Sequence, residues 1–188
     1  MGEPATGLLV VDAQQGLLQG EKAIPQADLV IDRLAFLLAG ARSAGAVVIH
    51  LQNDGAPGSP DEPETPGWLI HRKLTPEPGE VLLRKKQDDG FENTELQRIL
   101  ECAGVKCIAV GGVLSEMCVS ATVRGGLARG FEVILVHDAH ATYNLDDIPA
   151  AMVSRVAEHA LGSQVEIADS VAVAFERPNT SRPGQPHP

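Results

Sequence analysis

The chain alternates between short, continuously apolar runs and longer segments whose apolar residues recur at helical spacing. The apolar runs lie at 7–12, 46–52, 81–85, 105–112, 131–138 and 165–170, and the helical segments at about 25–44, 92–104, 115–129 and 146–161. A short run that is apolar on both faces is typical of a strand buried between two layers. Strands separated by crossover helices form a parallel sheet. The sequence therefore predicts an α/β fold: a three-layer sandwich with a mostly parallel six-stranded sheet and helices on both faces.

Chain length and the placement of proline and glycine predict how the chain is divided. With 188 residues the chain has the size of one domain, which we expect at 1–177, and the Pro-rich end at 178–188 is expected to be a flexible tail. The segment 53–80 is crowded with proline and glycine, so we expect a long loop with little regular structure. The first helical segment has one apolar stripe, which consists of Leu29, Val30, Leu34, Leu37 and Leu38.

Charge, the N-terminal segment and cysteine content indicate which partners, location and thiol state to expect. The sequence has 25 acidic and 15 basic residues and a formal net charge of -10, which disfavours binding to nucleic acid. No basic flank precedes a long apolar run at the N-terminus, so we expect no membrane partner and a cytoplasmic location. Three cysteines, an odd number, then predict reduced thiols. Of these, Cys102 and Cys107 are expected to fill the core.

Residues that can carry chemistry stand at the carboxyl ends of the predicted strands. Asp12 follows the first strand, 50–54 the second, Lys85 ends the third, 112–118 follow the fourth and Asp138 ends the fifth. In open parallel sheets, ligands bind outside the carboxyl ends of the strands. An acid, a lysine and a cysteine are therefore expected to converge on one rim of the sheet.

Cys118 stands shortly after the fourth strand, in the stretch GGVLSEMCVSAT. If Ser115 caps the following helix, Cys118 lies in its first turn, where the helix dipole and Lys85 would favour the thiolate. Asp12 could accept and return a proton, which would complete an activated nucleophile. The residues alone leave other interpretations open: Cys118 as a buried filler, Asp12 as a partner of neighbouring backbone amides, and Lys85 as a solvated surface charge.

Three motifs, in order, resemble those of the isochorismatase-like cysteine hydrolases, a family that includes nicotinamidases, N-carbamoyl amide hydrolases and antibiotic-inactivating amidases. The motifs are LLVVDAQQG, RKKQDDGFENTEL and VGGVLSEMCVSATVRGGLARGFEVILVHDA, and the resemblance extends from Gly7 to about Ala174. It implies that Asp12 is the family's acid, Lys85 its lysine and Cys118 its nucleophile. The spacing to the following aromatic residue and the sequence TEL favours Lys85 over Lys86.

The resemblance also implies the surroundings and the chemistry of these residues. It implies a cis peptide bond between Val113 and Leu114, and an oxyanion hole formed by the backbone N–H groups of Leu114 and Cys118. The Cys118 thiolate would attack the carbonyl of a small-molecule amide or lactam, Asp12 would protonate the departing nitrogen, and water would release the acid. Lys85 would hold the charged Asp12 and Cys118 side chains in position relative to each other. No cofactor is implied, and a homodimer or a higher homo-oligomer is expected because family members commonly assemble.

Within the family, the sequence points away from a metal-dependent nicotinamidase. The region after the second strand offers His50, Asp54 and His71 but no Asp-x-His, so no metal site is expected there. His137 and His140 are three residues apart, and strand alternation should place them on opposite faces. The presence of a cysteine argues against cleavage of the vinyl ether of isochorismate. The stretch before the lysine strand is similar to streptothricin-hydrolase-like amidases.

Four further residues are candidates for the substrate pocket, namely Gln14, Trp68, Phe91 and Tyr143. Trp68 could stack on a substrate ring or bury itself against a neighbouring subunit, and Phe91 and Tyr143 could also serve packing alone. The alternatives to a cysteine amidohydrolase are isochorismatase or nicotinamidase activity, a non-catalytic scaffold of the same fold, and a redox sensor that uses the thiol of Cys118 without turnover.

Overall fold

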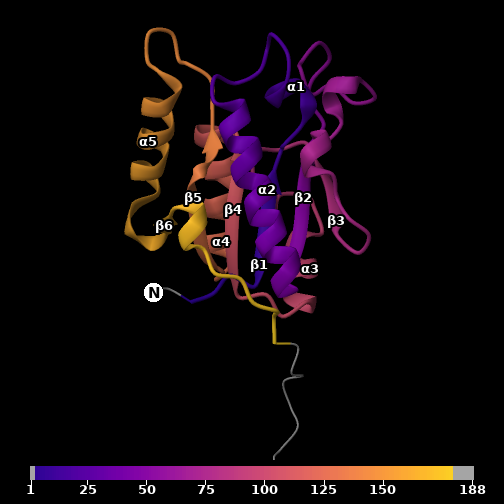
Figure 1. The fold of residues 1–188 in the computed structure, drawn as a ribbon, viewed down its shortest axis with the longest axis vertical. Helices are drawn as coiled ribbons and strands as arrows, with labels where there is room; N and C mark the ends of the chain where they lie inside the picture. Colours follow the sequence, from indigo (N-terminus) through magenta and orange to yellow (C-terminus); the bar gives the residue numbers. More distant parts are fainter. Residues whose placement is uncertain (1–2, 180–188) are drawn as a thin grey trace, which may run out of the picture.

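In the computed structural model, which describes residues 3–179, six strands form one sheet in which every neighbouring pair is parallel. The strands are β1 (Gly7–Val11), β2 (Val47–Asn53), β3 (Val81–Lys85), β4 (Cys107–Val113), β5 (Glu132–Ala141) and β6 (Glu166–Ala168). Their order across the sheet is β3-β2-β1-β4-β5-β6 (Figure 1). The predicted six-stranded sheet is therefore confirmed, and it is fully parallel.

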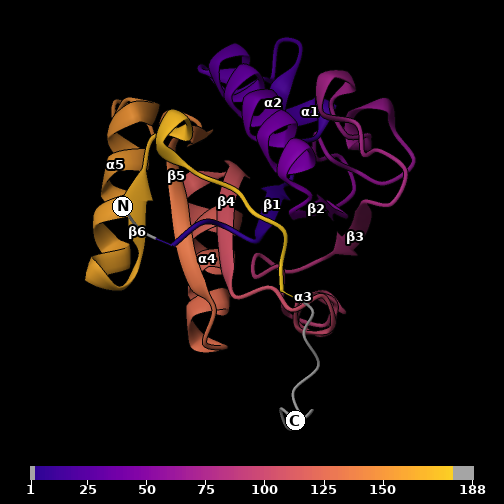
Figure 2. The ribbon, with the colours of Figure 1, turned by 60° about the horizontal axis from the view of Figure 1, so that its bottom comes forward.

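Helices cover both faces of this sheet, with α1 and α2 on one side and α3 and α4 on the other (Figure 2). The helices are α1 (Gln15–Leu18), α2 (Ala27–Ala44), α3 (Leu96–Cys102), α4 (Ser120–Ala128) and α5 (Ala150–Leu161), with a π-helical turn at Ser115–Val119. Single turns of 3-10 helix lie at Pro66–Trp68, Arg72–Leu74, Gly162–Gln164 and Ser170–Ala172. The predicted α/β sandwich is confirmed.

Alternating side chains of the central strand divide the core into two clusters. Leu8 and Val10 of β1 belong to the cluster that includes α1 and α2, whereas Leu9 and Val11 belong to the cluster under α3 and α4. This arrangement follows from the period of two along a strand, and it explains why the strand is apolar at every position. The two layers hold β1 rigidly, so the residue that follows it is fixed in space.

Two apolar positions differ from their predicted environments. Leu29 is 46% exposed, because it lies beyond the edge of the buried stripe of α2. That stripe is formed by Ala27, Val30, Ile31, Leu34, Leu37, Leu38 and Ala41. Cys102, at the last residue of α3, is exposed rather than buried in the core, whereas Cys107 is buried in β4.

The fifth strand is longer than predicted and is interrupted by a bulge. Val110 of β4 pairs with Leu135, but Gly112 pairs with His140, so that β5 advances further than β4 over the same stretch. Asp138 therefore does not end the strand at the rim. Its carboxylate accepts hydrogen bonds from the backbone N–H and the hydroxyl of Ser170, and it forms an ion pair with Arg33.

The bulge also overturns the prediction that His137 and His140 point to opposite faces. Both imidazoles contact the same carboxylate oxygen of Glu158, at 2.5 and 3.0 Å, because the bulge breaks the simple alternation along β5. The helix after this strand begins at Ala150 rather than at about residue 146. Its first backbone N–H donates a hydrogen bond to the side chain of Asn144.

Most of the predicted tail, residues 180–188, lies outside the described residues. The division into a domain at 1–177 and a tail remains a prediction. Between residues 3 and 179, no helix combines the length and the apolar character that crossing a membrane requires.

Candidate active site

The strand order puts the point where the chain reverses direction across the sheet between β1 and β4. From β1 the chain proceeds through α2 to β2 on one side, and from β4 it proceeds through α4 to β5 on the other. Loops that leave adjacent strands in opposite directions open a crevice at the carboxyl ends of those strands. Asp12 follows β1 directly and Cys118 lies in the turn after β4. Lys85 ends β3, and its long side chain reaches past β2 to meet them.

Lys85 contacts both of the other residues. Its Nζ lies 2.7 Å from Oδ2 of Asp12 and 3.2 Å from Sγ of Cys118. It also donates to the backbone oxygen of Gln87 at 3.1 Å and lies 3.4 Å from Oδ1 of Asn53. Asp12, Lys85 and Cys118 are 1%, 2% and 9% exposed. The structure thus brings together, in one buried cluster, the acid, the lysine and the cysteine that the sequence singles out.

The backbone around these residues has conformations that few side chains tolerate. Asp12 has a φ of 48°, a left-handed conformation that is uncommon outside glycine but is found more often for Asp and Asn. At Gly112 φ is 133°, and a Cβ there would lie 2.0 Å from the backbone oxygen of Val11. Only glycine permits this close approach of β4 to β1. The peptide bond between Val113 and Leu114 is cis.

The turn that carries Cys118 is not capped as predicted. Leu114 occupies the cap position, and the Ser115 hydroxyl contacts His140 and Ser154 instead of the helix N-terminus. Cys118 nevertheless lies in the first turn after β4, because it belongs to the π-helical turn Ser115–Val119. This turn continues into α4 without a break.

Burial sets the proton affinities of the three groups. It raises the pKa of Asp12 to about 6, against the opposing effect of Lys85. Burial also raises the pKa of the Cys118 thiol, and the Asp12 carboxylate adds to this effect, which outweighs the lowering by Lys85. Burial alone would lower the pKa of Lys85, but Asp12 and Cys118 raise it on balance. Lys85 thus favours the thiolate, as expected from the sequence, but burial and the Asp12 carboxylate outweigh its effect on the pKa of Cys118.

Asp12 and Cys118 line a cavity of about 490 Å³, a size suited to a small molecule. Leu114, Met117 and Tyr143 contribute to the same cavity. Further residues of the lining were not assigned a role from the sequence, namely Asn53, Asp61 and Asp88. Asn53 ends β2, so its position was among the strand ends considered from the sequence. Asp61 and Asp88 lie in loops, where the spacing of apolar residues gives no information.

Of the four predicted pocket residues, only Tyr143 lines this cavity. The side chain of Gln14 is fully buried and bridges Asn53 and Trp68. Trp68 donates to Asp54, and Arg84 lies over its ring at 4.8 Å. Phe91 packs in the core against Phe131, with ring centroids 5.9 Å apart. Three of the four therefore lie outside the lining of this cavity, and Gln14 contacts the lining residue Asn53.

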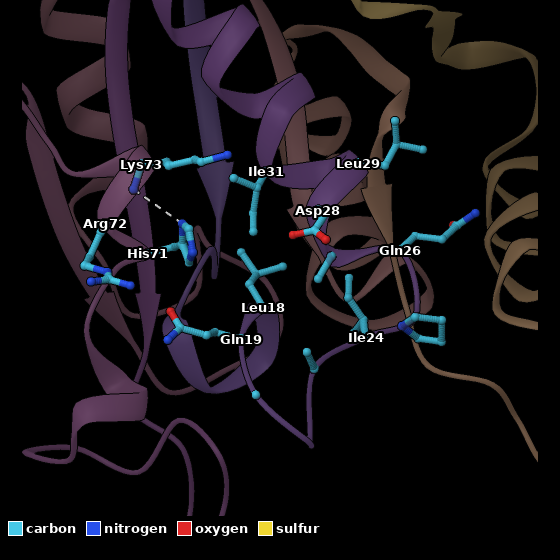
Figure 3. A pocket seen from close by; sticks show the side chains of 14 residues that line it. Leu18, Gln19, Ile24, Gln26, Asp28, Leu29, Ile31, His71, Arg72 and Lys73 are labelled. Carbon is cyan, nitrogen blue, oxygen red and sulfur yellow. Dashed lines mark hydrogen bonds between the residues drawn. The ribbon is translucent and has the colours of Figure 1, made fainter.

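A larger cavity, of about 990 Å³, lies beside the connection between α1 and α2 (Figure 3). Its lining comes from residues 18–31 and from His71 to Lys73, and it includes none of Asp12, Lys85 and Cys118. Nδ1 of His71 accepts a hydrogen bond from the backbone N–H of Lys73. The smaller cavity, which the cysteine lines, is therefore the candidate active site.

Neither His50 nor His71 lines the cavity that contains Cys118. His50 is fully buried in β2, where its Nε2 lies 3.1 Å from Glu80. His71 lies in the wall of the larger cavity. Within residues 3–179, no group of three His, Cys, Asp or Glu side chains is arranged to hold a metal ion.

The fold and the buried Asp, Lys and Cys can now be compared with those of known proteins. The model of the isochorismatase domain matches residues 6–168. The chain belongs to the isochorismatase family. The family resemblance inferred from the sequence is thereby confirmed.

Two of its relatives are streptothricin hydrolases of Streptomyces noursei. They are 54% and 52% identical to this chain over 91% and 90% of its length, and the matches cover 65% and 70% of the relatives. The chain thus spans about two thirds of the length of these proteins. The crystal structure of an isochorismatase from Pseudomonas putida KT2440 is similar in fold, with a TM-score of 0.85 and 30% identity over 92% of this chain and 94% of that one.

Proposed function

We propose that the protein is a cysteine amidohydrolase that cleaves a carbon–nitrogen bond in a small-molecule amide or lactam through a thioester on Cys118. The observation that carries this proposal is the double contact of Lys85 Nζ with Asp12 Oδ2 and Cys118 Sγ at the wall of a cavity. The similarity to two streptothricin hydrolases supports the same reaction type and makes streptothricin the first substrate to test.

Acylation begins with a proton transfer within the cluster. When Asp12 is ionised, it accepts the thiol proton as Sγ of Cys118 attacks the substrate carbonyl. Lys85 stabilises the negative charge that moves between sulfur and carboxylate. The backbone N–H groups of Leu114 and Cys118 donate hydrogen bonds to the oxyanion. Collapse of the tetrahedral intermediate breaks the C–N bond, and Asp12 returns its proton to the departing nitrogen.

Deacylation uses the same acid and base in reverse. A water molecule attacks the thioester carbonyl while Asp12 accepts one of its protons. The C–S bond then breaks and Asp12 returns that proton to Sγ of Cys118, which releases a carboxylic acid and regenerates the cysteine. One carboxylate oxygen of Asp12 is held by Lys85, whereas Oδ1 is buried and has no hydrogen-bond partner in the described part of the chain. An unpartnered buried acceptor is costly, and its retention fits an oxygen that must receive a proton during turnover.

The test is a hydrolysis panel of streptothricin, nicotinamide and N-carbamoyl compounds with wild type and Cys118→Ala, in which ammonia and new carboxylate are detected separately. We expect turnover of at least one substrate by wild type and its loss in Cys118→Ala. A lactam would yield carboxylate without ammonia, because its nitrogen stays attached. Absence of turnover with every substrate would overturn the proposal and favour a scaffold or a redox sensor. Activity that survives in Cys118→Ala would overturn the role of Cys118 as the nucleophile.

A further inference from the structure

A second buried cluster of polar side chains stands behind the turn that carries Cys118. Nδ1 of His140 lies 2.8 Å from the hydroxyl of Ser115, the first residue of the π-helical turn. Nε2 of the same imidazole lies 3.0 Å from Oε1 of Glu158, and the Ser115 hydroxyl lies 2.9 Å from that of Ser154. Ser115, His140 and Glu158 are 1%, 5% and 6% exposed.

The carboxylate of Glu158 fixes the direction of its hydrogen bond with His140. Hydrogen bonds from His140 and His137 outweigh the effect of burial and lower the pKa of Glu158, so its carboxylate is ionised and can only accept. His140 therefore donates to Glu158 through Nε2–H, and its Nδ1 shares a hydrogen bond with the Ser115 hydroxyl. The Ser115 hydroxyl also shares a hydrogen bond with that of Ser154. The side chains of Ser115, His140, Ser154 and Glu158 thus all have hydrogen-bond partners within this network, as a buried network requires.

The arrangement resembles a catalytic Ser-His-Glu set, but the serine is not placed to attack a substrate. Ser115 is almost fully buried, and its hydroxyl already has partners on both sides. Its backbone oxygen also accepts a hydrogen bond of 2.7 Å from the hydroxyl of Ser120, the first residue of α4. These contacts hold Ser115 at the side chain and at the main chain.

The π-helical turn needs such support. A π-helical turn is rare and holds one more residue than an α-helical turn, so relaxation to α geometry would rotate the residues within it about the helix axis. Cys118 lies three residues after Ser115 in this turn, and its sulfur must stay 3.2 Å from Lys85 Nζ. Misplacement of a reacting atom by about 1 Å can reduce turnover about a hundredfold.

We propose that His140 is a positioning residue for the nucleophile: through its hydrogen bond to Ser115, and oriented by Glu158 of α5, it fixes the π-helical turn that aims Cys118 at Lys85. This inference rests on the proposed role of Cys118. It assigns to α5, which supplies Ser154 and Glu158 and none of the three reacting residues, a part in the geometry of the site.

A matched pair of substitutions separates the two hydrogen bonds of His140. In His140→Asn the amide occupies the place of Nδ1 and keeps the contact with Ser115, whereas in His140→Gln it reaches the place of Nε2 and keeps the contact with Glu158. Ser115→Ala removes the first contact from the other side. All variants carry Cys102→Ser, because that exposed thiol would otherwise react with the probe.

Two readouts are compared at a temperature where circular dichroism shows each variant folded. The first is kcat and KM on the best substrate of the panel. The second is the rate of Cys118 alkylation by iodoacetamide, located by peptide mass spectrometry, which needs no substrate. We expect His140→Gln and Ser115→Ala to lower kcat about tenfold to a hundredfold with KM within about twofold. Their Cys118 should alkylate at least about threefold faster, because a loosened turn exposes the thiol. His140→Asn should stay near wild type in both.

Equal behaviour of His140→Asn and His140→Gln in both readouts would overturn the inference, and this pair decides the matter if Ser115→Ala does not fold. The two proposals can fail separately. If wild type hydrolyses nothing but alkylation separates the pair, the proposed function fails and the positioning role stands. If hydrolysis occurs but neither readout separates the pair, the positioning role fails alone.

Discussion

At the scale of single residues, Lys85 is the group on which the buried carboxylate depends. Lys85→Met should lower the free energy of unfolding at pH 8 by about 3–5 kcal/mol, because it leaves Asp12 charged and unpaired. The folded-state pKa of Asp12 is already raised, so its ionisation disfavours folding as the pH rises through about 6. The variant should therefore lose less at pH 5, where Asp12 is mostly neutral. Urea unfolding at the two pH values measures this difference.

The neighbouring lysine provides the control. Lys86 is exposed and makes no contact with Asp12, so Lys86→Met should change the free energy of unfolding by less than about 0.5 kcal/mol at either pH. Equal losses in the two variants would contradict the assignment of the buried ion pair to Lys85.

The pKa of Asp12 also predicts how the activity depends on pH. Asp12 must be ionised to accept the thiol proton, and its pKa is about 6. We expect kcat/KM to fall about tenfold per pH unit below an apparent pKa near 6, because the protonated fraction of the base then dominates. A rate profile from pH 4.5 to 8 on the best substrate measures this limb. An acid limb near pH 4, the ordinary value for an aspartate, would contradict the account.

The sequence was informative about the reacting residues and less so about their surroundings. Asp12, Lys85 and Cys118 were candidates because each stands at or just after a strand end, where the topology of a parallel sheet gathers side chains, and the family resemblance selected them. The proton affinity of Cys118 could not be predicted, because it depends on burial and on the distance to Asp12. Trp68, one of the possible pocket walls, lies outside the lining of the cavity that holds Cys118, and Arg84 lies over its ring.

At the scale of elements, the approach of β4 to β1 determines whether Asp12 and Cys118 can meet. Gly112→Ala should destabilise the fold by at least about 3 kcal/mol, because the new Cβ would lie 2.0 Å from the Val11 oxygen at a φ of 133°. Gly130→Ala is the matched control: φ is 82°, but no atom lies within 4 Å, so only about 1 kcal/mol of backbone strain is expected. Similar losses in urea unfolding of the two variants would show that the close approach does not matter.

Elements that follow simple periodicity could be predicted, and irregular ones could not. All six strands and four of the helices were expected from the spacing of apolar residues, since burial on one or two faces fixes that spacing. The bulge in β5 and the π-helical turn at Ser115–Val119 have no such signal, because they depend on hydrogen bonds between distant residues. These irregular elements lie next to the candidate active site, so the detailed geometry of that site could not be predicted from the sequence.

At the scale of the whole molecule, the number of subunits remains a prediction from the family resemblance. We expect a homodimer or a larger homo-oligomer. In the single chain Leu145, Met152 and Val156 are 57%, 57% and 61% exposed, and contact with a second copy would remove such apolar surface from water. Light scattering coupled to size-exclusion chromatography should give a mass of at least two chains. A mass of one chain at micromolar concentration would contradict the expectation.

The central claim, that Cys118 forms a thioester with the substrate, is tested most directly by trapping that intermediate. Wild type is mixed with streptothricin, quenched in acid within milliseconds to seconds, and digested for peptide mass spectrometry. The account predicts an adduct on the peptide that contains Cys118, removed by hydroxylamine and absent in Cys118→Ala. Its mass would equal the whole substrate for a lactam and only the acyl part for an open-chain amide. Turnover of streptothricin with no adduct on Cys118, and with activity retained in Cys118→Ala, would contradict the claim.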